Sequence, residues 1–270
     1  MQKVLSWGVP NSTEIKNENV GSILFHINAK TSSDVVAGLI SLNKIEIGLS
    51  IKRGNKEEVS FFDGYLGDLL QFIHGGSTSL ETVLEPTAVG YLINLEFANR
   101  FNIGVNDVLR VKTNFGSASA SFSSATNANS TIVIYTNPSS VANPQNYVAV
   151  YKSFQIPTGD VDFQKHLGTN VGKIMFHAHP SSTFDEVAQA NTNPLPLSSE
   201  IVANGYTEDK SQVELLAIAQ MAISYNPDSA VRNLVQYESA NILSDVRVKI
   251  KLSSPATINT KVLVTSYAVL

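Results

Sequence analysis

The last 26 residues of the chain carry the pattern that most limits its fold. In residues 245–252 apolar side chains alternate with one arginine and two lysines, and a turn with Pro255 follows. Residues 260–267 then form a second apolar stretch. Strict alternation is typical of a β-strand with one face in a core and the other in water. We interpret the segment as a β-hairpin.

The same pattern occurs near the middle of the chain. Residues 107–112 open it and residues 130–135 close it, with a region rich in Ser, Ala and Asn between them. Its Arg-Val-Lys triplet starts at Arg110 and the later one at Arg247, 137 positions apart and about half of the 270 residues. A pattern repeated at half the chain length predicts two similar β-domains in tandem. The alternative is a chance match between two short strands.

Other segments extend this interpretation. Alternating apolar residues predict further strands at residues 22–29, 42–52, 91–97, 147–154, 173–179 and 213–225. A helical apolar period predicts one helix from Phe62 to Ile73, with Asp63 as its cap and Gly75 at its end. Shorter helices are expected from Thr183, which has the Thr-x-x-Glu spacing of a capping box, and over residues 198–204.

The predicted domains follow from these elements. Residues 1–19 are polar and mixed and are expected to form an N-terminal arm, with Trp7 anchored on its own domain or, alternatively, on a neighbouring subunit. The Asn- and Pro-rich stretch 137–146 has turn chemistry throughout and places the boundary. The prediction is a first domain over 20–143 and a second over 144–270. Seven or eight short strands in each predict an all-β fold with short helical insertions, as two tandem eight-stranded jelly rolls.

Composition excludes several classes of function. Charged residues are only 16% of the chain and the net charge is −4, so no basic surface for sequence-independent nucleic-acid binding is expected. The absence of cysteine rules out disulfides and thiolate chemistry. The first residues contain no apolar run typical of a signal peptide, and no window reaches the roughly 20 apolar residues of a membrane span.

This order of elements resembles the double jelly-roll major capsid proteins of tailless icosahedral bacteriophages, most of all those of the corticovirus group. The resemblance lies in the pattern and spacing of residues 42–47, of 65–70 after them, and of 243–267. It extends over nearly the whole chain, but it does not rest on a diagnostic motif.

The resemblance implies a structural protein and not an enzyme. Members of that family form homotrimers with a pseudo-hexameric outline, which tile an icosahedral shell, often over an internal membrane. For this chain it therefore implies contacts with itself, with neighbouring trimers, with a vertex (penton) protein and with an internal viral membrane. It also implies a location in the virion capsid after synthesis in the host cytoplasm. It carries over no catalytic residue and no cofactor, and a structural calcium ion at an interface would have no assigned ligands.

The strongest competing chemistry is a metal site at His177 and His179. Residues two apart on a strand share a face, so both imidazoles could bind one metal, as in a two-barrel cupin-like metalloprotein or enzyme. The spacings to Gly172 and Glu186 differ from the cupin pattern, and no histidine follows His179. Two partly exposed histidines at the end of a strand are the simpler interpretation.

Two weaker alternatives complete the analysis. Asp160 and Asp162 could lie on one strand face and bind calcium, but the further spaced oxygens of an EF-hand loop are missing, so a solvated loop is expected. A carbohydrate-binding β-sandwich is disfavoured because the only tryptophan, Trp7, lies in the predicted arm.

Overall fold

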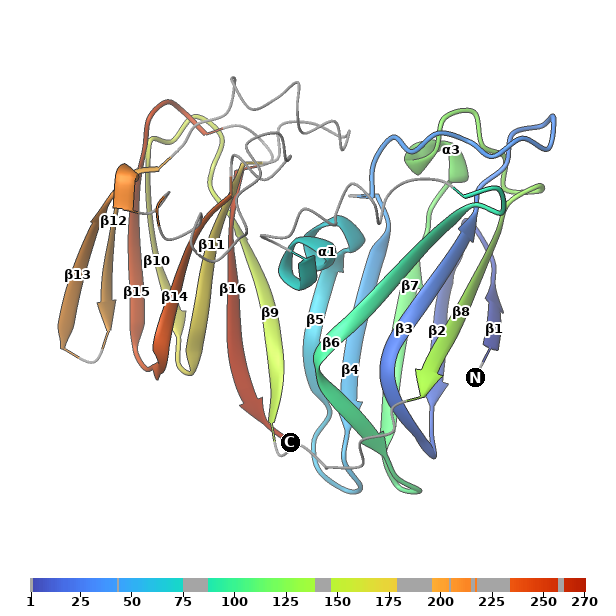
Figure 1. The fold of residues 1–270 in the computed structure, drawn as a ribbon, viewed down its shortest axis with the longest axis horizontal. Coiled ribbons are helices and arrows are strands. Elements are labelled where there is room, and N and C mark those ends of the chain that lie inside the picture. The colour runs from blue at the N-terminus through green and yellow to red at the C-terminus, as the bar shows by residue number, and fades with distance from the viewer. Residues whose placement is uncertain are drawn as a thin grey trace. The chain divides into compact units, whose positions relative to one another are not determined.

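The fold was described from a computed structural model of the chain (Figure 1). The structure describes residues 2–42, 44–74, 87–138, 147–178, 196–203, 205–214, 217, 234–256 and 260–270. These residues divide into two compact units. The first contains the described residues before Tyr151 together with Ala268–Leu270, and the second contains those from Tyr151 to Tyr267.

The first unit is a sandwich of two four-stranded antiparallel sheets. One sheet has the order β1-β8-β3-β6, with β1 (Gln2–Leu5), β8 (Thr131–Pro138), β3 (Glu18–Asn28) and β6 (Tyr91–Ile103). The other has the order β2-β7-β4-β5, with β2 (Pro10–Ile15), β7 (Val108–Asn114), β4 (Glu46–Lys52) and β5 (Val59–Tyr65). Helix α1 (Leu66–His74) follows β5, and the short helix α3 (Ala118–Ser121) lies between β7 and β8.

The second unit, with the adjoining residues 147–150 and 268–269, repeats this topology strand for strand. One sheet has the order β14-β11-β16-β9, with β14 (Leu234–Leu243), β11 (Val171–Ala178), β16 (Thr260–Val269) and β9 (Tyr147–Gln155). The other has the order β10-β15-β12-β13, with β10 (Asp162–Gly168), β15 (Val246–Leu252), β12 (Pro196–Ala203) and β13 (Tyr206–Ser211). In both units the first, eighth, third and sixth strands form one sheet, and the second, seventh, fourth and fifth form the other. The prediction of two tandem eight-stranded jelly rolls is confirmed.

Alternation along the strands builds each core. Every second residue of β15 is buried, and its buried residues pack with those of the opposite sheet, such as Ile174, Phe176 and Val262. In the first unit Phe25, Ile47 and Val111 are among the side chains with at most 1% exposure. Each fully buried aliphatic or aromatic side chain contributes on the order of 1.5–3 kcal/mol, so this alternation is the main source of stability.

The predicted hairpins are wrong in one respect. β7 pairs with β2 and β4, and β15 pairs with β10 and β12, so neither pairs with the strand that follows it. The following strands, β8 and β16, belong to the opposite sheets. Two consecutive strands can bury their apolar faces against each other when they lie in the two opposite sheets of a sandwich. Alternation of apolar residues alone does not distinguish this arrangement from a hairpin.

The predicted N-terminal arm is also wrong. Residues 2–5 and 10–15 are the first and second strands of the first unit, paired with β8 and β7. The prediction that Trp7 docks on its own domain is confirmed, because its ring lies 5.5 Å from Phe115 and 6.0 Å from Phe122, edge-on to both. Short polar strands at a sheet edge bury few residues, so their sequence resembles that of an arm. The exact domain boundaries remain a prediction.

The helix predictions are partly corrected. The segment 62–73, predicted to be one helix, is the end of a strand followed by a helix. Phe62 and Asp63 pair with β4, so Asp63 is not a helix cap. The helix begins at Leu66. Residues 198–203 form part of strand β12 and not a helix. Residues 212–214 and 217 are helical, which contradicts the start of the strand predicted at 213–225. The helix predicted from Thr183 lies outside the described residues.

The connections between strands differ between the two ends of each sandwich. Those after the second, fourth and sixth strands are short, such as residues 16–17 and 104–107 in the first unit and 169–170 and 244–245 in the second. Five of them contain a residue with a left-handed backbone conformation, with φ between 50° and 79°: Asn17, Gly54, Asn170, Gly205 and Asp245. Because strand direction alternates, these connections share one end of their sandwich, while the other end carries longer segments such as 29–45 and 115–130. In the part of the chain that is described, no helix is long and apolar enough to cross a membrane.

Candidate functional site

The structure leaves the predicted histidine pair without a defined site. His177 lies on β11, where its backbone is in register with Leu234 and Lys261. His179 lies outside the described residues. Among the residues that are described, no group of three or more His, Asp, Glu or Cys side chains could hold a metal ion. The metal-binding alternative therefore remains untested.

The predicted aspartate pair is split between a loop and a strand. Asp160 lies in the loop after β9, where its backbone bonds to Pro157 and Ala256. Asp162 begins β10 in register with Lys251. Both aspartates are exposed, and the loop is held by backbone hydrogen bonds. Calcium binding here remains an untested alternative to the expected solvated loop.

The outer face of sheet β2-β7-β4-β5 carries an ion-pair network centred on Arg110. Nη2 of Arg110 donates to Oε1 of Glu14 at 2.9 Å, and Nη1 donates to Oε1 of Glu58 at 2.6 Å. Ser50 donates a further hydrogen bond to Glu58, and Lys16 pairs with Glu14 at 2.7 Å. One guanidinium thus connects the edge strand β2 to the loop before β5 across the sheet.

The network shifts the pKa values of its members. Lys16 first, and Arg110 second, lower the pKa of Glu14 to about 2. The hydrogen bond from Ser50 is the main cause that lowers the pKa of Glu58, with Arg110 adding to it. The pKa of Arg110 is raised, chiefly by its hydrogen bond with Glu14. All three groups are therefore charged at neutral pH.

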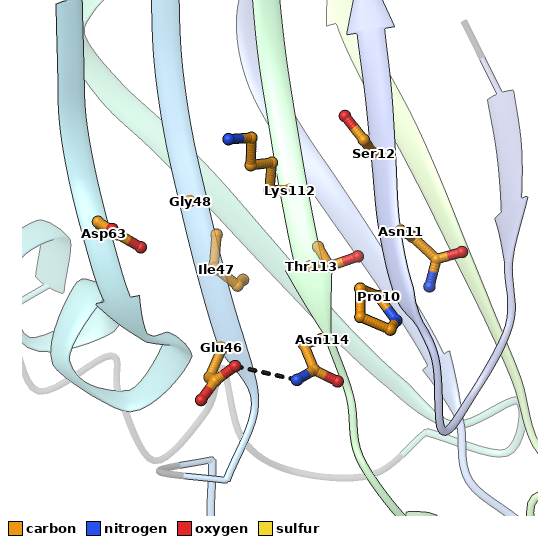
Figure 2. A pocket seen from close by; sticks show the side chains of 10 residues that line it. All are labelled: Pro10, Asn11, Ser12, Glu46, Ile47, Gly48, Asp63, Lys112, Thr113 and Asn114. Carbon is orange, nitrogen blue, oxygen red and sulfur yellow. Dashed lines mark hydrogen bonds between the residues drawn. The ribbon is translucent and has the colours of Figure 1, made fainter.

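A depression lies beside this network on the same face (Figure 2). Its volume is about 360 Å³, and it is lined by residues of all four strands of the sheet, among them Ser12, Glu46, Gly48, Asp63 and Lys112. A Cβ atom placed on Gly48 would lie 3.4 Å from Cβ of Lys112 and 3.6 Å from Oδ1 of Asp63. The hollow therefore exists because Gly48 has no side chain between an acidic and a basic neighbour.

The charges around the depression are only partly neutralised. Nδ2 of Asn114 donates to Oε2 of Glu46 at 3.0 Å (Figure 2). Asp63 is exposed and pairs with no other side chain among the described residues. The carboxylate of Asp63 can therefore accept hydrogen bonds from a group outside the chain, although Lys112 also lines the depression.

Part of the outer face of the other sheet, β1-β8-β3-β6, has the opposite character, as far as the row of Asn137, Ser22 and Glu96. Register places Val4, Val133, His26 and Leu92 in one row across its four strands. The adjacent row and the start of the next add only uncharged residues: Gln2, Tyr135, Leu24, Asn94, Asn28 and Thr131. These ten residues include no Asp, Glu, Lys or Arg, and we call them the uncharged face. Val4 is 64% exposed and Leu92 is 40% exposed, so apolar surface is open to solvent there.

In the second unit, the equivalent of the charged face is sheet β10-β15-β12-β13. Arg247, Lys249 and Lys251 project outward from β15, and we call them the β15 basic stripe. Nζ of Lys249 pairs with Oε1 of Glu200 at 2.5 Å. Arg247 is in register with His166 and Val202, and no acidic side chain of the described residues pairs with it.

These faces are not predicted above, although the distribution of charged residues along single strands indicates them. The outward positions of β7 and β15 carry Arg and Lys, whereas those of β3 and β8 within the uncharged face carry neither. The pairing of strands into sheets was needed to show that the uncharged positions lie side by side.

Comparison with known proteins supports the architecture. The chain is similar to the crystal structure of the major capsid protein P2 from bacteriophage PM2, with a TM-score of 0.54, 10% sequence identity, and coverage of 99% of this chain and 97% of that one. It is also similar to the crystal structure of the STIV MCP, with a TM-score of 0.54, 13% identity, and coverage of 99% and 96%. No family model matches the sequence, and no curated protein matches it. At these identities the likeness shows the shared fold, which extends over both jelly rolls.

Proposed function

We propose that this chain is the major capsid protein of an icosahedral virus, a structural subunit and not an enzyme. The observation that carries the proposal is the exact repetition of one eight-stranded topology in two units of a single chain. A protein of known capsid function, P2 of bacteriophage PM2, has this fold over 97% of its length. A chain with two similar units offers six similar lobes when three copies assemble, which is the number that packs on a hexagonal lattice.

In this role the chain acts as a homotrimeric, pseudo-hexameric capsomer. Capsomers bind one another and a vertex protein, and the shell they form surrounds an internal membrane. The protein is made in the host cytoplasm and resides in the virion capsid. Its function needs no cofactor, and its sites are surfaces for assembly.

The uncharged face supports assembly through the first unit. Interfaces between subunits are depleted of charged residues in their buried core. A face of ten uncharged residues with Val4 and Leu92 open to solvent fits that description, whereas the face around Arg110 does not. We therefore assign the uncharged face to the contact between subunits of one trimer.

The direct test is the mass and symmetry of the purified protein. Mass photometry is expected to give a particle of about three times the 29.2 kDa of one chain, and single-particle images are expected to show three-fold particles with six lobes. A monomer or a two-fold dimer at all concentrations would contradict the proposal. Metal analysis of the same sample, with the His177→Ala variant as its control, would then test the metalloprotein alternative.

A further inference from the structure

The depression at Gly48 and the β15 basic stripe have complementary features that the proposed trimer does not use. The depression presents Asp63, an exposed carboxylate that pairs with no other side chain among the described residues. The stripe presents Arg247, an exposed guanidinium that pairs with no acidic side chain among the described residues. One group lies in the first unit and the other in the second.

We propose that the depression at Gly48 is a docking site for Arg247 of a second copy of this chain, which joins the first jelly roll of one subunit to the second jelly roll of another. The inference rests on the proposed function and deepens it by naming a contact that builds the shell. It joins two different surfaces, so it is heterologous. Such contacts can propagate from one capsomer to the next.

The size and shape of the depression fit this occupant. Its volume of about 360 Å³ is large enough to admit one long side chain. Asp63 lies on one side of Gly48 and can accept a bidentate pair of hydrogen bonds from a guanidinium. Glu46 adds a second negative charge at the rim.

Lys112 limits which cation can enter. Its side chain lies on the other side of Gly48 from Asp63, so the site repels a cation that arrives alone. It favours an occupant that also brings a carboxylate. Asp245 stands two residues before Arg247, is exposed and bonds to Nε2 of His166 at 2.9 Å. The turn and the start of β15 together therefore carry a charge of each sign. This matched pair distinguishes Arg247 from Lys249, whose charge is already paired with Glu200.

A charge exchange tests the contact in the full-length protein. Asp63→Lys and Arg247→Asp are each expected to leave the trimer intact and to raise the protein concentration needed for shell assembly at least about tenfold, because like charges then face each other. The double variant restores opposite charges and is expected to return this concentration to within about threefold of the wild type. Light scattering and electron microscopy of assembled particles measure the effect.

Matched controls separate this contact from a general effect of charge. Glu57→Lys and Lys152→Asp change the charge by the same amount at other exposed positions of the two units and are expected to assemble normally. Gly48→Val fills the depression with a residue that strands favour, so it is expected to keep or raise the Tm while blocking assembly.

The outcomes also separate the inference from the proposed function. Normal assembly of Asp63→Lys or Arg247→Asp, or a double variant as impaired as the single ones, would overturn the contact while leaving the capsid function in place. A wild-type protein that never forms trimers would overturn both.

Discussion

Arg110 and Arg247 occupy corresponding places in the two jelly rolls, on the outer face of the seventh strand, but they meet different partners on the second strand. Arg110 is in register with Glu14 and bonds to it, whereas Arg247 is in register with His166 and pairs with no acidic side chain of the described residues. The same Arg-Val-Lys triplet therefore closes an internal network in one unit and leaves a guanidinium exposed in the other.

This difference predicts how the first unit responds to acid. The pKa values of Glu14 and Glu58 are lowered in the folded state, so both groups stabilise the fold above their ordinary pKa of 4.5. For Glu14 that contribution is lost as the pH falls from about 4.5 towards about 2. Arg110→Met is expected to lower the Tm by a few degrees at pH 7 and to have less effect at pH 2–3. Thermal unfolding across this pH range measures it, and an equal effect at both pH values would contradict the network.

Asp107 is expected to be a major stabilising residue of the loops at the short-turn end. Its Oδ2 accepts hydrogen bonds from Nη1 of Arg53 at 2.8 Å and from the backbone N–H of Gly104 at 3.1 Å, and its Oδ1 accepts one from the N–H of Gly54 at 3.0 Å. Burial opposes its ionisation, but these bonds lower its pKa. Asp107→Asn is expected to cost about 1–3 kcal/mol in the free energy of unfolding. Asp162→Asn, at an exposed position, is the control and should cost less than about 0.5 kcal/mol.

Gly90 is expected to tolerate no side chain. Its φ is +114°, and a Cβ atom there would lie 2.5 Å from the carbonyl oxygen of Ile27. Gly90→Ala must displace backbone, so it is expected to cost more than about 2 kcal/mol. Gly38→Ala meets nothing within 4 Å and is the matched control. Denaturant unfolding compares the two, and equal stability would show that β3 can move away from Gly90.

Leu92 tests the uncharged face. Leu92→Glu is expected to leave each chain folded but to prevent trimer formation, because a buried interface does not accept an unpaired carboxylate. Ser12→Glu places the same charge on the outer face of the other sheet, beside Lys112, and should form trimers normally. Analytical ultracentrifugation and circular dichroism distinguish lost assembly from lost folding. Trimers of normal stability from Leu92→Glu would show that the contact between subunits does not involve the uncharged face.

Removal of residues 1–10 is expected to unfold the first unit. The deletion removes β1 and also Trp7, which is 7% exposed and packs against Phe115 and Phe122. Trp7→Ala alone should cost about 3–5 kcal/mol. Calorimetry should show a transition at lower temperature for one unit in Trp7→Ala, and the loss of that transition in the truncated chain. If the truncated chain folded with a normal Tm and failed only to assemble, residues 1–10 would act as an arm after all.

The sequence predicted the architecture better than the connections within it. Alternation along residues 245–252 and 107–112 indicates strands, because burial of every second side chain requires an apolar residue at every second position. The repetition of this pattern indicates two domains. Alternation does not reveal the partner strand. A connection that passes from one sheet to the opposite one, as between β7 and β8, therefore has the same sequence pattern as a hairpin. Phe62 fits a helical pattern although it lies on β5, because the apolar residues of a strand that leads directly into a helix can match the helical period over a few positions.

The candidate surfaces were harder to predict for a related reason. Val133 and Leu92 are 41 positions apart in the sequence, and only the pairing of β8, β3 and β6 brings them into one row. Similarly, Asp63 and Lys112 flank Gly48 because β5 and β7 pair with opposite edges of β4. A property of a sheet face depends on register between distant strands, which a single strand does not contain.

The contrast between short and long connections has a consequence for variation. At one end of each sandwich the turns are two to six residues long, and Asn17, Asn170 and Asp245 hold left-handed conformations that leave little room for extra residues. At the other end the chain already makes excursions such as 29–45 without disturbing the strands. Inserted peptide tags should therefore be accepted at the long-connection end and rejected at the opposite one, so that the long connections can change in length and sequence while the strands keep theirs.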